Sequence, residues 1–133
     1  VAAVESSVAA GKYTGDNYVV DHVVIPRVHE QVVAAINCTT EIGKVNAVGV
    51  MEFWDVTSAI FGADAAVKAA EVTIMELRTG MGIGGKSFVV LTGEVAAVTE
   101  AVNCGAAYGE EAGMLLNKVV IPNPSIEIFE GLI

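Results

Sequence analysis

An incomplete internal repeat constrains the fold of this 133-residue chain more than any other sequence feature. Val1-Ala2-Ala3-Val4 recurs as Val95-Ala96-Ala97-Val98, and Val23-Val24-Ile25-Pro26 recurs as Val119-Val120-Ile121-Pro122. The two echoes are offset from each other by two residues, a difference that one small change of loop length accommodates. The chain therefore carries parts of two copies of one small domain.

The second copy, residues 46–133, has the pattern of a complete domain. Alternating residues at 46–54 predict a strand, and Asp55 is suited to cap a following helix with an apolar stripe. The further expected elements are strands at 72–78 and 88–92, a helix from about Glu94, a strand at 115–121 and a short amphipathic turn at 126–133. This βαββαβ order predicts an α+β, ferredoxin-like domain: an antiparallel sheet with helices on one side.

The first copy, residues 1–36, matches only the last third of such a domain, and residues 37–45 form a linker. We expect a helix at 1–12, a strand at 19–25 and a tail at 29–36. Val8 matches Val102 and Gly11 matches Gly105, two residues that the helix from about Glu94 should place on one packing face with Val95 and Val98. A piece of about 36 residues rarely folds alone. It should therefore pack on the second copy, on another subunit, or on a further segment of about 50 residues before Val1.

The stretch RTGMGIGGKSFVVLTG satisfies the phosphate-loop pattern through Gly80, Gly85, Lys86 and Ser87. In a phosphate loop, a helix begins at the lysine and directs unpaired N–H groups at phosphate oxygens. Here the residues after Lys86 are aromatic and β-branched, which favours a strand. We therefore expect the glycines to form a hairpin turn between two strands.

Charge and composition exclude several classes of function. The chain has 16 acidic and 7 basic side chains and a formal net charge of −9, so it lacks the basic surface that nucleic acid requires. A hydrophobic content of 53% indicates a folded domain, and no run approaches the roughly 18 apolar residues of a membrane helix. We expect a soluble protein without nucleic-acid or membrane partners.

The cysteines and histidines are too scattered to suggest a metal site or a catalytic site. Cys38 and Cys104 are far from each other and from His22 and His29, without the paired spacing of zinc or iron–sulfur ligands. We expect buried free thiols in a reducing cytoplasm, no cofactor and no catalytic residues.

Four segments resemble one family. They are AVGVMEFWDVTSAIFGADAAVKAAEV, GMGIGGKSFVVLTGEVAAV and KVVIPNPSIEIF in the second copy, and VVDHVVIPRVH in the first. Together they are similar to bacterial microcompartment shell proteins of the tandem-domain, trimer-forming type, here with an apparently truncated first domain. The resemblance implies a structural protein rather than an enzyme. It implies a homotrimer that mimics a hexamer, tiles with other shell proteins around a cytoplasmic microcompartment, and has a central pore for small metabolites.

The resemblance also implies where the functional residues lie. The hairpin residues that would line the pore are Met81, Gly82, Ile83, Gly84, Gly85 and Lys86. Lys68 and Arg27 match the edge residues that meet across the seam between tiles, although Asn123 and Ser125 depart from that pattern in the second copy. Some tandem members hold a metal cluster on hairpin cysteines, but this hairpin has no cysteine, so no metal is expected.

Simpler interpretations remain open for these residues. The hairpin is also compatible with a surface turn that binds nothing, and Lys68 with a helix pair to Asp64, worth roughly 0.3 kcal/mol. A ferredoxin-like domain can instead be an oligomeric regulatory module that binds small molecules. Extended sheets would indicate a tile, and a small closed oligomer would indicate such a module. A nucleotide hydrolase has only the phosphate-loop pattern in its favour.

Overall fold

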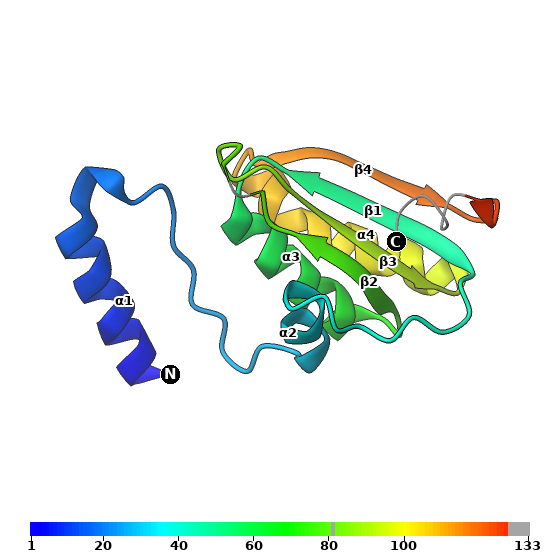
Figure 1. Cartoon of the computed structure of the whole chain (residues 1–133), viewed down its shortest axis with the longest axis horizontal. Coiled ribbons are helices and arrows are strands. Elements are labelled where there is room, and N and C mark those ends of the chain that lie inside the picture. The colour runs from blue at the N-terminus through cyan, green and yellow to red at the C-terminus, as the bar shows by residue number, and fades with distance from the viewer. Residues whose placement is uncertain (81, 128–133) are drawn as a thin grey trace.

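The computed structural model describes residues 1–80 and 82–127. The elements in chain order are α1 (Ala2–Gly15), the 3-10 helix η1 (Asp16–Tyr18), α2 (Glu30–Ile36), β1 (Ala47–Phe53), α3 (Val56–Ala69), β2 (Thr73–Arg78), β3 (Ser87–Gly93), α4 (Val95–Glu111) and β4 (Leu115–Ile121). Figure 1 shows α3 and α4 on one face of the sheet and α1 standing apart from this body. The amphipathic turn expected at 126–133 lies mostly outside the described residues.

The four strands form one antiparallel sheet in the order β2-β3-β1-β4. Val50 at the centre of β1 pairs with Val90 of β3 and with Val119 of β4. The predicted βαββαβ order and the α+β class are confirmed, and β4 has the predicted bounds.

Successive side chains of β1 point to opposite faces of the sheet, and both faces are apolar. Met51 and Phe53 are fully buried and belong to the core that the helices cover. Val48 points to the opposite face and belongs to a second cluster with Met75 and Val90. Ile42 and Val45 pack on that cluster, so the linker at 37–45 covers part of the second face.

The two sheet-covering helices approach each other through glycine. A Cβ at Gly62 of α3 would lie 2.6 Å from the carbonyl oxygen of Gly105 of α4. A Cβ at Gly105 would lie 2.7 Å from the carbonyl oxygen of Gly62 and 2.8 Å from the sulfur of Met51. These distances are too short for any side chain at Gly62 or Gly105, and the atoms in the way include the backbone of the facing helix. The helices therefore touch backbone to backbone, directly above β1.

Helix α2, the tail of the first copy, packs on the second copy. Its residues Val32 and Ala35 are buried in the main core. The side chain of Gln31 donates to the carbonyl of Val72 at 3.1 Å and accepts from the amide of Ile74 at 2.9 Å. These bonds satisfy a backbone group of β2 and one of the residue just before it, at an edge strand whose unpaired groups would otherwise be open to other chains.

The rest of the first copy does not pack in this way, and the strand predicted at 19–25 is wrong for this structure. Residues 19–25 run as an extended connector, because a strand requires a partner and no strand of the described residues lies beside them. In the second copy the equivalent strand β4 has β1 as its partner. Helix α1 forms as predicted but has no buried residue.

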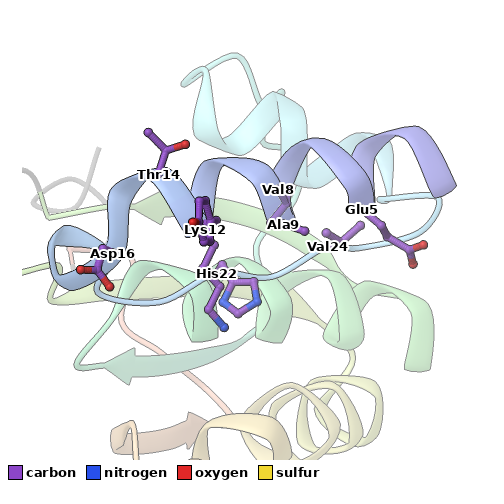
Figure 2. Close-up of a pocket in the computed structure, with 9 residues that line it drawn as sticks. Glu5, Val8, Ala9, Lys12, Thr14, Asp16, His22 and Val24 are labelled. Atoms are coloured by element: carbon purple, nitrogen blue, oxygen red, sulfur yellow. The ribbon is translucent and has the colours of Figure 1, made fainter.

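An open cleft of about 1060 Å³ separates α1 from the connector. Figure 2 shows Val8 and Lys12 of α1 on the side of the helix toward His22 and Val24. The repeat equates Val8 with Val102 and Val24 with Val120, and both of these pack in or against the core of the second copy. The same apolar positions that fill a core in one copy therefore line an open cleft in the other.

The prediction of buried thiols is only partly right. Both cysteines are free, as expected, but Cys38 is exposed and Cys104 is half-buried. Cys38 follows α2 in a left-handed conformation with φ 56°, in a surface loop. Cys104 lies beside the buried stripe of α4, where a hydrogen bond to the carboxylate of Glu100 raises the pKa of its thiol. Val95, expected on the buried face, is 43% exposed at the start of α4.

Within the described part of the chain, no helix combines the length and the apolar character that crossing a membrane requires.

We expect Gly105→Ala to destabilise the domain by about 1–3 kcal/mol, because the added methyl group meets the backbone of α3 and the sulfur of Met51. Urea unfolding followed by fluorescence of the single tryptophan, Trp54, measures this change. Gly43→Ala is the control, since Gly43 is exposed in the linker and a Cβ there meets no described atom within 4 Å. Equal stability of Gly105→Ala and wild type would contradict the backbone contact.

Candidate functional site

The turn between β2 and β3 contains three backbone positions whose conformation only glycine adopts without strain. Gly82, Gly84 and Gly85 have φ angles of 77°, 76° and 90°, the left-handed region that side chains with a Cβ avoid. Ile83 between them is 65% exposed. Figure 1 shows the turn at the end of the sheet near the start of α3. Met81, predicted to line the pore with these residues, lies outside the described part of the chain.

Ser87 holds the base of the turn. Its hydroxyl donates to the carbonyl of Gly85 at 2.8 Å and accepts from the amide of Gly80 at 3.4 Å. A Cβ at Gly80 would lie 2.1 Å from the carbonyl oxygen of Lys86, so the two sides of the turn touch here. The serine and the first glycine of the phosphate-loop pattern thus close a hairpin, and β3 begins at Ser87 where a phosphate loop would begin a helix. The prediction of a hairpin is confirmed.

Lys86 points back to the sheet. Its ammonium lies 2.9 Å from the carboxylate of Glu52 on β1 and 5.8 Å from the centre of the Trp54 ring. The pair neutralises the one basic side chain at the base of the turn. The exposed part of the turn at residues 82–86 therefore offers backbone amide and carbonyl groups, the side chain of Ile83 and a partly exposed lysine that is paired with a carboxylate.

A cleft of about 250 Å³ lies between the turn and the start of α3. Gly84 and Gly85 form one side, and Asp55, Thr57 and the connector residue Asp21 form another. Asp55 caps α3 as predicted by accepting from the amide of Ser58 at 3.3 Å. The Thr57 hydroxyl contacts the carboxylates of both Asp21 and Asp55, and its hydrogen bond lowers the pKa of Asp21.

The sequence had no signal for this contact of the connector with the second copy. Asp21 and Thr57 are 36 residues apart and lie in two separate segments of the sequence, with no pattern that relates one to the other.

Lys68, the predicted edge residue of α3, lies in the last turn of that helix. Its side chain is 41% exposed, and its ammonium pairs with the carboxylate of Asp64 one turn earlier. Arg27 is exposed, has φ 52°, and makes no ion pair with any residue that the structure describes. The amide of His29, two residues after Arg27, donates to Asp64 at 2.7 Å. The loop that carries Arg27 therefore reaches the helix that carries Lys68.

The glycine turn and Lys68 lie at opposite ends of α3. The Cβ position of Gly85 lies 3.7 Å from backbone atoms of Asp55 and Val56, at the first turn of the helix. Lys68 is twelve residues after Val56, which corresponds to about 18 Å along a helix axis. The two predicted functional regions are thus separated by about the length of α3.

Comparison with known proteins decides the family. Residues 47–124, more than half of the chain, match the BMC domain. The chain belongs to the BMC domain family. It is 35% identical over all of its 133 residues to the bacterial microcompartment shell protein PduT of Citrobacter freundii, of which it covers 72%. It is also 35% identical over 83 residues, 62% of the chain, to 86% of the shell protein PduA of the same organism.

A solved structure of this family has the same fold over nearly the whole chain. It is the crystal structure of a microcompartments protein from Desulfitobacterium hafniense, with a TM-score of 0.87 and 46% identity. The likeness covers 98% of this chain and 72% of the other. The resemblance to tandem-domain BMC shell proteins is thereby confirmed, and with it the expected structural role of a shell protein.

We expect this BMC protein not to bind ATP at micromolar concentrations, because Lys86 is paired with Glu52 and no helix begins at the glycines. Isothermal titration with ATP and Mg²⁺ tests this expectation. Lys86→Ala should give the same baseline as wild type, and Lys44→Ala serves as the control for removing an exposed positive charge. Micromolar binding that only Lys86→Ala abolishes would contradict it.

Proposed function

We propose that this chain forms trimeric tiles of a bacterial microcompartment shell, with the glycine turns around a central pore and Lys68 at the outer edge. The observation that carries the proposal is the placement of the turn and Lys68 at opposite ends of α3 in a BMC domain. A flat tile needs one region that meets its symmetry-related copies at the centre and another that meets neighbouring tiles at the rim. One helix that spans the domain supplies both.

The chemistry of the turn supports a role in passing small metabolites. Backbone amide and carbonyl groups can exchange hydrogen bonds with a polar solute without holding it tightly, and passage requires such weak binding. Gly82 and Gly84 have no described atom near their Cβ positions, so the backbone itself forms the surface there. The neutralised Lys86 would then flank the opening. Met81 completes the proposed pore segment in sequence.

Residues 1–36 fit the proposal as the end of a first BMC domain. The tail helix α2 docks on the second copy, but α1 and the connector leave an apolar cleft open between Val8 and Val24. In the second copy, a sheet and a helix cover the equivalent positions. We infer that further elements of a BMC domain cover α1 in the assembled tile, so that three chains supply six domain positions.

The proposed role is structural rather than enzymatic. The Ser87 hydroxyl is occupied in holding the base of the turn, and Lys86 is bound in an ion pair. The other proposed partners are shell proteins of the same compartment, which would meet this tile at the edge that carries Lys68 and Arg27.

Lys68→Asp should leave the trimer intact and abolish ordered sheets. The aliphatic part of the lysine side chain can be buried at a seam while its ammonium reaches carbonyl oxygens of the neighbouring tile, whereas an aspartate is too short and has the wrong charge. Negative-stain electron microscopy detects sheets, and sedimentation velocity reports the trimer.

Two further variants control for the charge change. Lys44→Asp introduces the same charge on the exposed linker and should assemble normally. Lys68→Ala avoids placing two carboxylates one turn apart and should still lose the sheets. Normal sheets from both Lys68 variants would refute the edge assignment.

A further inference from the structure

Asp64 is a buried carboxylate whose two oxygens have different partners. The residue is only 5% exposed on the α3 face toward the first-copy tail. One oxygen, Oδ1, accepts from the backbone amide of His29 at 2.7 Å. The other, Oδ2, accepts from the ammonium of Lys68 at 2.5 Å. A buried carboxylate is tolerated only when it is paired and hydrogen-bonded, and these two donors meet that need.

The His29 amide is held in a fixed position. His29 is the N-cap of α2, and its ring nitrogen accepts from the amide of Gln31 at 3.2 Å. Gln31 in turn bonds to the backbone of β2, and Val32 is buried in the core. The amide that donates to Asp64 therefore belongs to a docked helix rather than to a free loop.

Lys68 is held on one side and open on the other. An ammonium has three N–H donors, and the contact with Asp64 uses one of them. The side chain remains 41% exposed, so the other donors can reach a neighbouring molecule. A lysine side chain that already has a fixed direction loses less conformational entropy when it binds.

We propose that Asp64 is a positioning residue that directs Lys68 toward the neighbouring tile, and that the first-copy tail fixes Asp64 through the His29 amide. This inference rests on the proposed edge role of Lys68. Through this path the docking of one BMC copy on the other sets the geometry of the edge, because α2, Asp64 and Lys68 are joined by consecutive hydrogen bonds.

Asp64→Asn tests the proposal because it separates the two bonds. The amide oxygen of asparagine can still accept from His29, whereas its NH₂ group cannot hold an ammonium. We expect an unchanged trimer, a melting temperature within about 2 °C of wild type, and a threshold concentration for sheets raised about threefold or more. Glu111→Gln, which removes an exposed carboxylate at the end of α4, should change none of these.

A second readout reports the position of Lys68 before assembly. In unassembled trimers, acetylation of Lys68 relative to Lys44, measured by mass spectrometry, should be about threefold faster in Asp64→Asn, since the amine is no longer held by a carboxylate. A carboxylate that served only the stability of the fold would leave this ratio unchanged. If Asp64→Asn lowers the melting temperature, Asp64→Glu replaces it, because its longer side chain keeps the charge and shifts the ammonium.

The outcomes separate this inference from the proposed function. Normal assembly of Lys68→Ala refutes the edge itself, and with it the role of Asp64 there. Loss of sheets in Lys68→Ala together with wild-type assembly and acetylation of Asp64→Asn overturns the positioning role alone. Asp64→Asn that assembles more readily than wild type overturns it as well, because the ion pair would then withhold Lys68 from the seam.

Discussion

The backbone contact between Gly62 and Gly105 is the constraint on which the rest of the domain depends. It brings α3 and α4 close enough for both to cover one face of a four-stranded sheet, with Met51 and Phe53 enclosed beneath them. Because α3 is fixed in this way, its two ends are fixed as well. The capping residue Asp55 then lies beside the glycine turn, and Lys68 lies at the opposite end. Helix packing thus sets the distance between the two proposed functional regions.

The turn between β2 and β3 and the region around Lys68 differ in how their charges are paired. Lys86 at the base of the turn is neutralised by Glu52, which leaves backbone groups as the main polar surface of the turn. Lys68 is paired with Asp64 but remains partly exposed. Asp64 also accepts from the His29 amide, so the first-copy tail and Lys68 are connected through one carboxylate. In the proposed tile, the tandem arrangement would therefore fix the position of Lys68 at the edge, in addition to letting three chains mimic a hexamer.

The sequence correctly predicted the elements that depend on nearby residues, but not those whose structure depends on partners far away in the chain. The cap at Asp55, the hairpin after Gly85 and the bounds of β4 follow from nearby residues, and all three are confirmed. The predicted strand at 19–25 has a strand-like composition but no partner in the described chain. The bonds from Gln31 to β2 and from Lys86 to Glu52 join residues that no motif relates, so only the fold reveals them.

The central claim is that this BMC protein is a tile with glycine turns at its centre and Lys68 at its rim. A cryo-electron microscopy map of the assembled protein tests it most directly, since the map locates both regions relative to the symmetry axis. The account predicts that residues 82–86 of three chains surround a threefold axis, and that Lys68 lies at the seam between neighbouring trimers. Turns on the outer rim, or Lys68 beside the axis, would contradict it.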